Sequence, residues 1–553
     1  MKKKWISCLL ATGMLLSCGL TACGGGTGGG DAEGKTEIYV ATYPGGLGLD
    51  WLRDSALRFE EKYKGKSFEE GKMGVKVQVV ESQSGDMLAS RSLDKDVYLT
   101  EAVDYYYMQN QGKFADISDV ATDILSAYGE NVSIADKLDG AMKDFLTAKD
   151  GNYYAIPFYE GFYGFIYDAD MFEVNGWFLD ENGNFTKTNK SKGIDGVAGT
   201  YDDGLPKTYA QFSKLLDKIR GDGVTPFVYS SETMVYFLNV LASYWSDYEG
   251  KEKMQRNWSL DGEIDIISSF DGDTPVTETV EINVSATDSG NMLDLQKQPG
   301  KYYALKFLKE VVMGNGSNYV SATDFKAAQF QLIQSCLDGE MQPEPVAMII
   351  DGSWFENEAE EADTFEVVSQ LDFRDDIAGK DYKKTRKLSF MPIPMIDESE
   401  ATLNHGSKTA DGAHKQTLFS ANDSFCFINA GTTGAKLEVS KEFLKFVHTN
   451  DELSKFTQRT SITCPYDYTI TESEKADMSY FGQTLMEMKS ASDIVYPYSN
   501  HEFYVANSSN FMLGVWGWRS RIEGTSAVNP FNYFRANPKT TVRTYFEGLH
   551  AAH

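Results

Sequence analysis

The pattern that most constrains the fold is a strand, a helix and a second strand near the start of the chain. Residues 36–42, TEIYVAT, are typical of a buried strand, and apolar side chains recur at helical spacing over 49–63. Val75, Val77 and Val79 then alternate in VKVQVV, as in a further strand. This order predicts a parallel βαβ unit, and ligands bind such open sheets beyond the carboxyl ends of the strands.

The same alternation continues along the chain, which indicates an α/β protein. Further strands are expected at DVYL, YYAIPFYEGFYGFIYD, AMIIDGSW and SFCFINA, and helices at TYAQFSKLLDKIR and SKEFLKFV. With 553 residues the chain is too long for one ordinary core and should divide into lobes. A polar stretch over residues 246–300 contains the alternating runs EIDIIS and TVEINV, which predict a surface β-hairpin insertion.

The first residues form a targeting segment. Three lysines precede the apolar run LLATGMLL, which is too short for a permanent membrane helix. LTAC then resembles the lipobox of bacterial lipoproteins, so residues 1–22 would be a signal peptide and Cys23 would be lipidated. The alternative is an ordinary signal peptide with a chance cysteine. The Gly-rich residues 23–35 would tether the folded part to the extracytoplasmic face of the cell membrane.

Charge and cysteine content exclude some classes of partner and site. Loss of residues 1–22 removes three of the 52 basic residues and none of the 81 acidic ones, which leaves a formal charge of −32. Such a surface repels nucleic acid and suits a neutral or cationic ligand. Cys336, Cys426 and Cys464 would remain, and this odd, widely spaced set argues against a disulfide framework and a zinc site.

Four blocks, in order, carry a resemblance to a known family. They are residues 153–172, YYAIPFYEGFYGFIYDADMF; residues 347–355, AMIIDGSWF; residues 388–395, LSFMPIPM; and the segment that begins FCFINAG. In this order they resemble the carbohydrate-binding, maltose-binding-protein-like group (family 1) of extracellular solute-binding proteins of ABC importers. The first block resembles a hinge crossing, and the second a strand followed by a tryptophan on the sugar platform.

The resemblance implies a two-lobed periplasmic-binding-protein-like fold of type II. Each lobe would be a mostly parallel sheet flanked by helices, with a hinge between the lobes. Lobe 1 would comprise 36–157 and 396–460, and lobe 2 would comprise 158–395 and 461–553. The implied function is that of a monomeric lipoprotein that captures a carbohydrate, an oligosaccharide, and delivers it to an ABC permease without catalysis.

A sugar site pairs aromatic planes with planar hydrogen-bonding groups, because sugar rings have an apolar face and an edge of hydroxyls. The chain carries candidates of both kinds near the predicted strand ends. The stacking candidates are Tyr43, Trp51, Tyr159, Phe162, Tyr163, Trp245, Trp354, Trp516 and Trp518, and the hydroxyl partners are Asp86, Glu160, Asp351, Asp423 and Arg519.

Each candidate also has a purely structural explanation. An aromatic side chain is more often part of the core, and aspartates beside Gly, Asn or Ser, such as Asp86 and Asp423, commonly cap or turn the backbone. The family pattern places Trp354 and Glu160 at the cleft, which favours these two over the others.

Residues 193–204, GIDGVAGTYDDG, form an Asp-rich loop. Its oxygen donors, Asp195, Thr200, Asp202 and Asp203 with the Val197 carbonyl, suit a structural calcium ion, and the adjacent aspartates would otherwise repel each other. The spacing is not that of an EF-hand. The alternative is a solvated Asp-Gly turn. No catalytic cofactor is expected.

Two other functions remain open at this stage. The same fold with a peptide or other amine as ligand would use the same aromatic side chains and the acidic surface. A lipid-anchored glycoside hydrolase would need only two suitably spaced carboxylates. The chain has no HExxH, Walker A, GxSxG or dinucleotide-binding motif, so it is expected not to be an enzyme.

Overall fold

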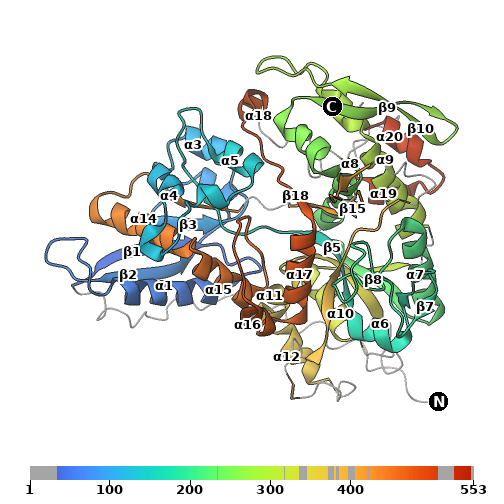
Figure 1. Ribbon diagram of the computed structural model, residues 1–553, viewed down its shortest axis with the longest axis horizontal. Helices are drawn as coiled ribbons and strands as arrows, with labels where there is room; N and C mark the ends of the chain where they lie inside the picture. The colour runs from blue at the N-terminus through green and yellow to red at the C-terminus, as the bar shows by residue number, and fades with distance from the viewer. Residues whose placement is uncertain are drawn as a thin grey trace.

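The computed structural model describes residues 34–232, 234–314, 316, 318–335, 345–371, 379–380, 385–396, 405–410, 412–420, 424–507, 518 and 529–549. Two separate five-stranded sheets define two lobes, which lie side by side in Figure 1. Lobe 1 is the part built on the sheet β2-β1-β3-β17-β4, and lobe 2 is the part built on β11-β8-β12-β5-β13. The predicted α/β class and the two-lobed fold are confirmed.

Lobe 1 begins with the predicted βαβ unit. β1 pairs in parallel with β2, in a register that joins Thr36 to Val75, and with β3 on its other side. Trp51, Leu52, Ala56, Phe59 and Tyr63 line the buried face of α1, which packs on the sheet. The elements are β1 (Thr36–Thr42), α1 (Asp50–Tyr63), β2 (Val75–Glu81), α2 (Gly85–Ala89), β3 (Val97–Thr100), α3 (Tyr105–Asn110), α4 (Ser118–Thr122), α5 (Gly140–Leu146) and β4 (Ile156–Pro157).

A segment from late in the chain completes the lobe 1 sheet. β17 (Phe425–Ile428) runs antiparallel between β3 and β4, with Phe425 opposite both Thr100 and Pro157. The helices α14 (Gly434–Val447) and α15 (Asn450–Thr460) follow and pack beside α1. The sheet is therefore parallel in its first three strands and antiparallel where the chain returns.

Lobe 2 repeats this arrangement. β11, β8 and β12 are parallel, and β5 and then β13 are added in antiparallel pairs. The elements are β5 (Tyr163–Asp168), α6 (Ala169–Asn175), β6 (Phe178–Leu179), β7 (Phe185–Thr186), α7 (Tyr209–Gly221), β8 (Thr225–Ser230), α9 (Pro299–Lys306), β11 (Tyr319–Ala322), α10 (Phe325–Ile333), β12 (Val346–Gly352), α11 (Phe355–Glu361), α12 (Thr364–Ser369) and β13 (Leu388–Met391).

The predicted hairpin insertion is shorter than expected. α8 (Met234–Ser259) kinks at Gly250, whose φ is 77°, and continues past residue 246 because Met254, Asn257 and Trp258 are buried. The antiparallel hairpin of β9 (Glu263–Asp271) and β10 (Thr274–Glu281) then follows. Residues 246–259 are thus helix and not part of the hairpin.

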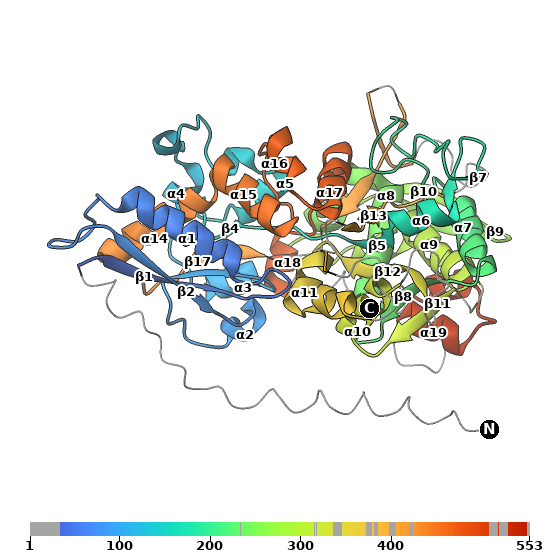
Figure 2. The same ribbon diagram turned by 90° about the horizontal axis from the view of Figure 1, so that it is seen from below.

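The remaining elements lie between and around the lobes. α17 packs on β13, with the Ser389 hydroxyl 3.0 Å from that of Thr484, and Figure 2 shows α15, α16 and α17 along one side of the molecule. Among the described residues no helix has both the length and the apolar character to cross a bilayer. These elements are β14 (Ser407–Lys408), β15 (His414–Lys415), β16 (Thr417–Phe419), α16 (Glu472–Ala476), α17 (Tyr480–Ala491), β18 (Asp493–Val495), α18 (Glu502–Asn507), α19 (Pro530–Ala536) and α20 (Val542–Glu547).

Candidate functional site

The two lobes meet where the loop after β1 touches the start of α11. A Cβ atom on Gly46 would lie 2.8 Å from both the Trp354 Cβ and the Glu358 Cγ atoms, so only a glycine allows this approach without a shift. The carboxyl ends of β1, β3 and β12 reach the same place. We call this contact region the lobe junction; its residues are Tyr43, Gly46, Glu101, Tyr159, Tyr163, Tyr236, Gln329, Asp351, Trp354 and Glu358.

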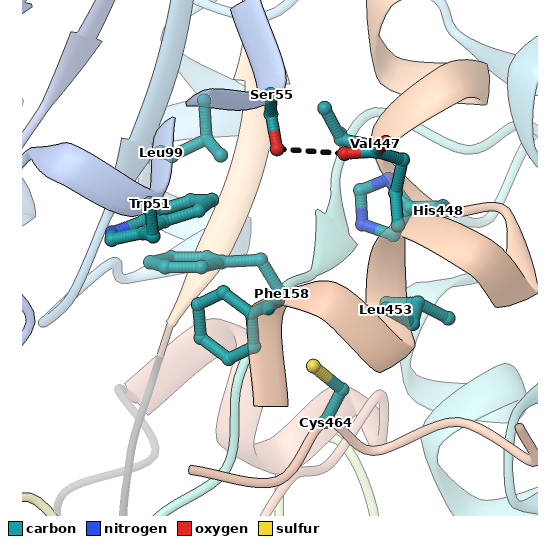
Figure 3. A pocket seen from close by; sticks show the side chains of 10 residues that line it. Trp51, Ser55, Leu99, Phe158, Val447, His448, Leu453 and Cys464 are labelled. Carbon is teal, nitrogen blue, oxygen red and sulfur yellow. Dashed lines mark hydrogen bonds between the residues drawn. The ribbon is translucent and has the colours of Figure 1, made fainter. Parts of the chain in front are cut away.

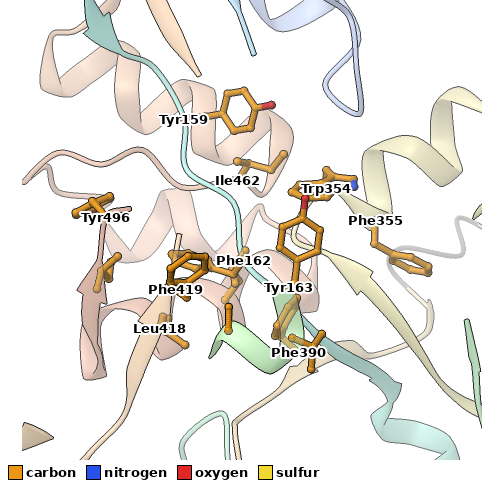
Figure 4. Packing of buried hydrophobic residues seen from close by; sticks show 14 of the residues in the cluster. Tyr159, Phe162, Tyr163, Trp354, Phe355, Phe390, Leu418, Phe419, Ile462 and Tyr496 are labelled. Carbon is orange, nitrogen blue, oxygen red and sulfur yellow. The ribbon is translucent and has the colours of Figure 1, made fainter. Parts of the chain in front are cut away.

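Three aromatic rings from lobe 2 form one side of the junction. Trp354, just before α11, makes T-shaped contacts with Tyr163 at 4.9 Å and with Tyr236 at 5.7 Å between ring centroids. Tyr163 and Tyr236 also contact each other at 5.0 Å. Figure 4 shows Tyr163 against Trp354, with Tyr159 further along the same segment. This group supplies the aromatic planes that a sugar site requires.

Lobe 2 also contributes two carboxyl groups joined by one amide. The Gln329 Nε2 atom donates to Asp351 Oδ2 at 3.1 Å and to Glu358 Oε2 at 2.9 Å. Burial raises the pKa of Asp351, and burial together with the charge of Asp351 raises the pKa of Glu358. Each acid therefore favours its protonated form more than an exposed carboxyl does.

A third carboxyl group comes from lobe 1 and is bonded by the segment between β4 and β5, residues 158–162, which we call the crossing segment. The Tyr159 hydroxyl donates to Glu101 Oε2 at 2.6 Å, and burial raises the pKa of Glu101. Burial, followed by the charges of Glu101, Glu358 and Asp86, raises the pKa of Tyr43. The junction therefore combines aromatic rings, carboxyl groups and an amide from both lobes.

Glu160, which was expected to bind ligand hydroxyls, has a different role in the structure. It is 1% exposed, and its carboxylate accepts hydrogen bonds from the Thr463 hydroxyl at 2.7 Å and the Tyr496 hydroxyl at 2.8 Å and pairs with Lys489. Its oxygens are thus bonded within the protein. Glu160 joins the crossing segment to the chain after α15.

Trp51 lies inside lobe 1 and not at the junction. Its ring stacks with Phe158 at 6.2 Å and meets Phe456 edge-on at 4.9 Å. These rings line a small cavity of about 20 Å³ with Ser55, which donates to Glu452 (Figure 3). A cavity of this size holds a single water molecule at most. Trp51 is therefore a core residue.

Trp245 and Trp518 lie inside lobe 2, where they surround a lysine of the protein itself. The Lys301 ammonium lies 4.3 Å from the Trp245 ring centroid and 5.3 Å from that of Trp518. Their relative exposures are 1% and 2%, so neither ring is accessible to a sugar. Burial lowers the pKa of Lys301 to about 7. The expected stacking faces are used in a cation–π cluster instead.

The other candidates are placed as follows. Phe162 is buried, and its backbone bonds with Ser353. Asp86 is exposed at the start of α2, where it accepts from the Met87 N–H and the Ser84 hydroxyl. Asp423, Trp516 and Arg519 lie outside the described residues, as does Cys23.

The Asp-rich loop is held by its own hydrogen bonds. Asp202 accepts from the Asp195 N–H at 2.9 Å, Asp195 from Val197 at 2.7 Å and Asp203 from the Gly199 N–H at 2.7 Å, while the Thr200 hydroxyl is 3.0 Å from Asp202. Within the described part of the chain, no group of three His, Cys, Asp or Glu side chains is arranged for a metal ion. These bonds account for the loop without calcium, which remains a prediction. After the loop, Thr208 caps α7, and its side chain accepts from the Gln211 N–H.

A larger hollow lies at the other end of the lobe 2 sheet. Its volume is about 430 Å³, and Arg386, Lys387, Met478, Tyr480 and Gln483 are among the residues that line it. Leu388 pairs with Asp168, at the end of β5 opposite to Tyr163, so this hollow is remote from the junction. The strand-end rule favours the junction as the functional site.

Several junction residues were not anticipated from the sequence. Glu101 directly follows the strand VYLT, so the strand-end rule that selected Tyr43 could also have found it. Glu358 stands four residues after Trp354, one helical turn away, which is a weaker signal. Gln329 lies on α10 and Tyr236 on α8, and no sequence pattern near either residue marks it as part of a site.

Solved structures with a similar fold are binding proteins. A cyclic α-maltosyl-1,6-maltose binding protein from Arthrobacter globiformis shares 11% identity at a TM-score of 0.52, over 94% of this chain and 98% of that one. The apo form of RafE from Streptococcus pneumoniae shares 14% sequence identity at a TM-score of 0.52, over 94% of this chain and 97% of that one. The GacH receptor of Streptomyces glaucescens was solved unliganded and with acarbose. It shares 11% sequence identity at a TM-score of 0.50, over 94% of this chain and 97% of that one.

The sequence itself also matches a family model. No curated protein sequence matches the chain. The model for bacterial extracellular solute-binding proteins, however, matches residues 54–415, which is more than half of it. This match covers the junction residues of both lobes from Glu101 to Glu358. The chain therefore belongs to the bacterial extracellular solute-binding protein family.

Proposed function

We propose that the protein captures a carbohydrate, specifically an oligosaccharide, at the lobe junction and delivers it to the permease of an ABC transporter. The observation that carries this proposal is the set of aromatic planes, carboxyl groups and an amide that the strand ends of both lobes bring together. Sugar rings need both kinds of group. The sugar-binding proteins with a similar fold support the same ligand class.

Binding would use motion of the lobes about their connecting segments. A ligand that contacts Trp354 in lobe 2 and Glu101 in lobe 1 interacts with both lobes only when they approach each other. Such a ligand binds the closed state more tightly than the open state, and this difference in affinity shifts the population toward the closed state. The close contact of Gly46 with α11 is what a closed state requires.

The protein would act outside the cytoplasm, as a monomer anchored in the cell membrane by lipid on Cys23. The LTAC motif supports the lipid anchor, and the family match supports the extracytoplasmic location. The Gly-rich residues 23–35 would give the lobes freedom to reach a permease.

We further propose that the protein is not an enzyme. A glycosidase needs its two carboxyl groups on either side of the scissile bond. In this chain the Gln329 amide bridges Asp351 and Glu358, which are the two closest acids of the junction. The alternative ligand, a peptide or other amine, would still use the acidic groups of the junction.

Calorimetric and thermal-shift screening of oligosaccharides, amino acids and peptides tests the proposal. We expect binding of an oligosaccharide without turnover, detected by chromatography of the recovered glycan. Binding of a peptide with failure of every glycan would overturn the carbohydrate assignment, and cleavage of a bound glycan would establish the hydrolase.

Trp354→Ala and Trp51→Ala form a matched pair for locating the site. Loss of a stacking ring at position 354 should weaken glycan binding by about 1–3 kcal/mol. Trp51→Ala should lower the melting temperature, while the folded fraction keeps its affinity. If the two variants behave alike, the junction is not the binding site.

A further inference from the structure

The amide between Asp351 and Glu358 leaves one buried acceptor without a partner. Gln329 is fully buried, and its Nε2 atom donates to both carboxyl groups. Its Oε1 atom is also buried and has no hydrogen-bond partner among the described residues. Buried acceptors without a donor are rare, because each costs about 1–3 kcal/mol in free energy. The Gln329 Oε1 atom can therefore accept a hydrogen bond from a ligand.

Positive charge is also missing from this group. In the described part of the chain, neither Asp351 nor Glu358 forms an ion pair, and Lys326 acts on Glu358 only from a distance. Glu101 faces Glu358 from the other lobe and adds a further negative charge. The uncharged neighbours are Tyr43, Tyr163 and Tyr236. Buried carboxyl groups are normally paired with a cation.

We infer that the junction binds a protonated amino group of the ligand at Gln329, Asp351 and Glu358, so that the preferred carbohydrate is an amino sugar. This inference rests on the proposed function and deepens it. An ammonium group has three N–H donors and one positive charge. It can therefore satisfy the free amide oxygen and neutralise the carboxyl pair, whereas a neutral hydroxyl offers one donor and no charge.

The same geometry makes binding depend on pH in a defined direction. Asp351, Glu358 and Glu101 have raised pKa values, so at low pH they are protonated and offer no negative charge to an ammonium group. As pH rises they ionise, and affinity for an amine that is still protonated increases. Affinity for a neutral glycan should not rise in this way.

The experiment compares pairs of sugars that differ only at nitrogen. Calorimetry at about pH 6 and about pH 8 is carried out with oligomers of glucosamine and of N-acetylglucosamine of equal length, with maltooligosaccharides and with alkylamines. The amino form should bind about tenfold or more tightly than its N-acetyl partner, since a charged hydrogen bond contributes about 1.5–3 kcal/mol. The alkylamines, whose ammonium group stays protonated at both pH values, should bind more tightly at the higher pH.

Glu358→Gln tests the residue assignment, and Glu360→Gln is the matched control. Both lie on α11 and lose one negative charge, but only Glu358 contacts Gln329. Glu358→Gln should remove most of the preference for the amino form, while Glu360→Gln should keep it. Melting temperatures establish that both variants fold, and Asp351→Asn provides a second variant with the same expected result.

The outcomes separate this inference from the proposed function. A neutral or N-acetyl glycan that binds as tightly as its amino partner, or more tightly, overturns the amino-sugar inference and leaves the carbohydrate function in place. Binding of alkylamines without any glycan supports the cation site and overturns the carbohydrate function. Failure of every probe overturns both.

Discussion

Two buried acidic sites lie close together in the molecule, and they are compensated differently. Glu160, on the crossing segment, is paired with Lys489 and bonded by two hydroxyl groups. Asp351 and Glu358, at the junction, share the Gln329 amide, Asp351 also accepts from the Gly352 N–H, and neither forms an ion pair among the described residues. A buried charge needs a partner, and at the first site the protein supplies it. At the second site the described residues supply no cation, and in our proposal the ligand supplies it.

Removing the cation from the first site should have the largest effect. Lys489→Met leaves Glu160 buried and unpaired, which should lower the free energy of unfolding by about 3–5 kcal/mol. Urea denaturation measures this change. The double variant Glu160→Gln with Lys489→Met should recover part of the loss. An exposed pair, Lys64 with Glu61, is the control, and Lys64→Met should cost less than about 1 kcal/mol. If both lysine variants lost the same free energy of unfolding, the buried pair would be no more important than the exposed one.

Removing the negative charges of the second site should increase stability at higher pH, in contrast to the loss expected at the first site. The pKa values of Asp351 and Glu358 are raised on folding, so the stability of the unliganded closed state is greatest at low pH and falls as pH rises above their usual range. The double variant Asp351→Asn with Glu358→Gln should remove most of this fall. X-ray scattering at several pH values would show whether the wild-type lobes open first. A pH-independent radius of gyration for the wild-type protein would contradict this prediction.

Hindering closure of the lobes without changing any charge separates the effect of motion from that of charge. Gly46→Ala places a Cβ atom against Trp354 and Glu358, which should cost about 1–2 kcal/mol in ligand affinity through hindered closure. Gly140→Ala, at a position with no atom near the added Cβ, should leave affinity unchanged. Calorimetry of both variants measures the effect. If Gly46→Ala binds as well as the wild type, the junction does not close on the ligand.

The Asp-rich loop should give the smallest effect, because it lies away from both acid sites. If calcium binds there, a chelator should lower the melting temperature by about 2–4 °C while ligand affinity is retained. Differential scanning calorimetry with and without chelator measures the shift. An unchanged melting temperature, with no bound ion in elemental analysis, would establish a metal-free turn at Asp195, Asp202 and Asp203.

The sequence predicted the fold better than the site. Alternating valines and helical spacing are local patterns, so β1, α1 and β2 were found nearly to the residue. The role of an aromatic ring depends on what tertiary structure places beside it. Trp354 meets two tyrosines at the junction, whereas Trp245 meets Lys301 in the interior, and no pattern near either residue distinguishes them.

The same limit applies to the acidic residues. Glu160 follows a strand and a proline, as a ligand-binding residue would, but its partners Lys489 and Tyr496 come more than 300 residues later. Gln329 has no local signal, since its importance comes from standing between two acids. Residues that act through long-range partners require the structure.

The completion of the lobe 1 sheet by β17 has a consequence for biogenesis. Residues 36–157 supply four of its strands, but β4 pairs only with β17, which ends at Ile428. During synthesis, the lobe 1 sheet therefore cannot be completed until the chain has been made as far as β17. The early strands of lobe 1 lack this partner for most of that time. The topology thus makes completion of the first lobe depend on a strand from late in the chain.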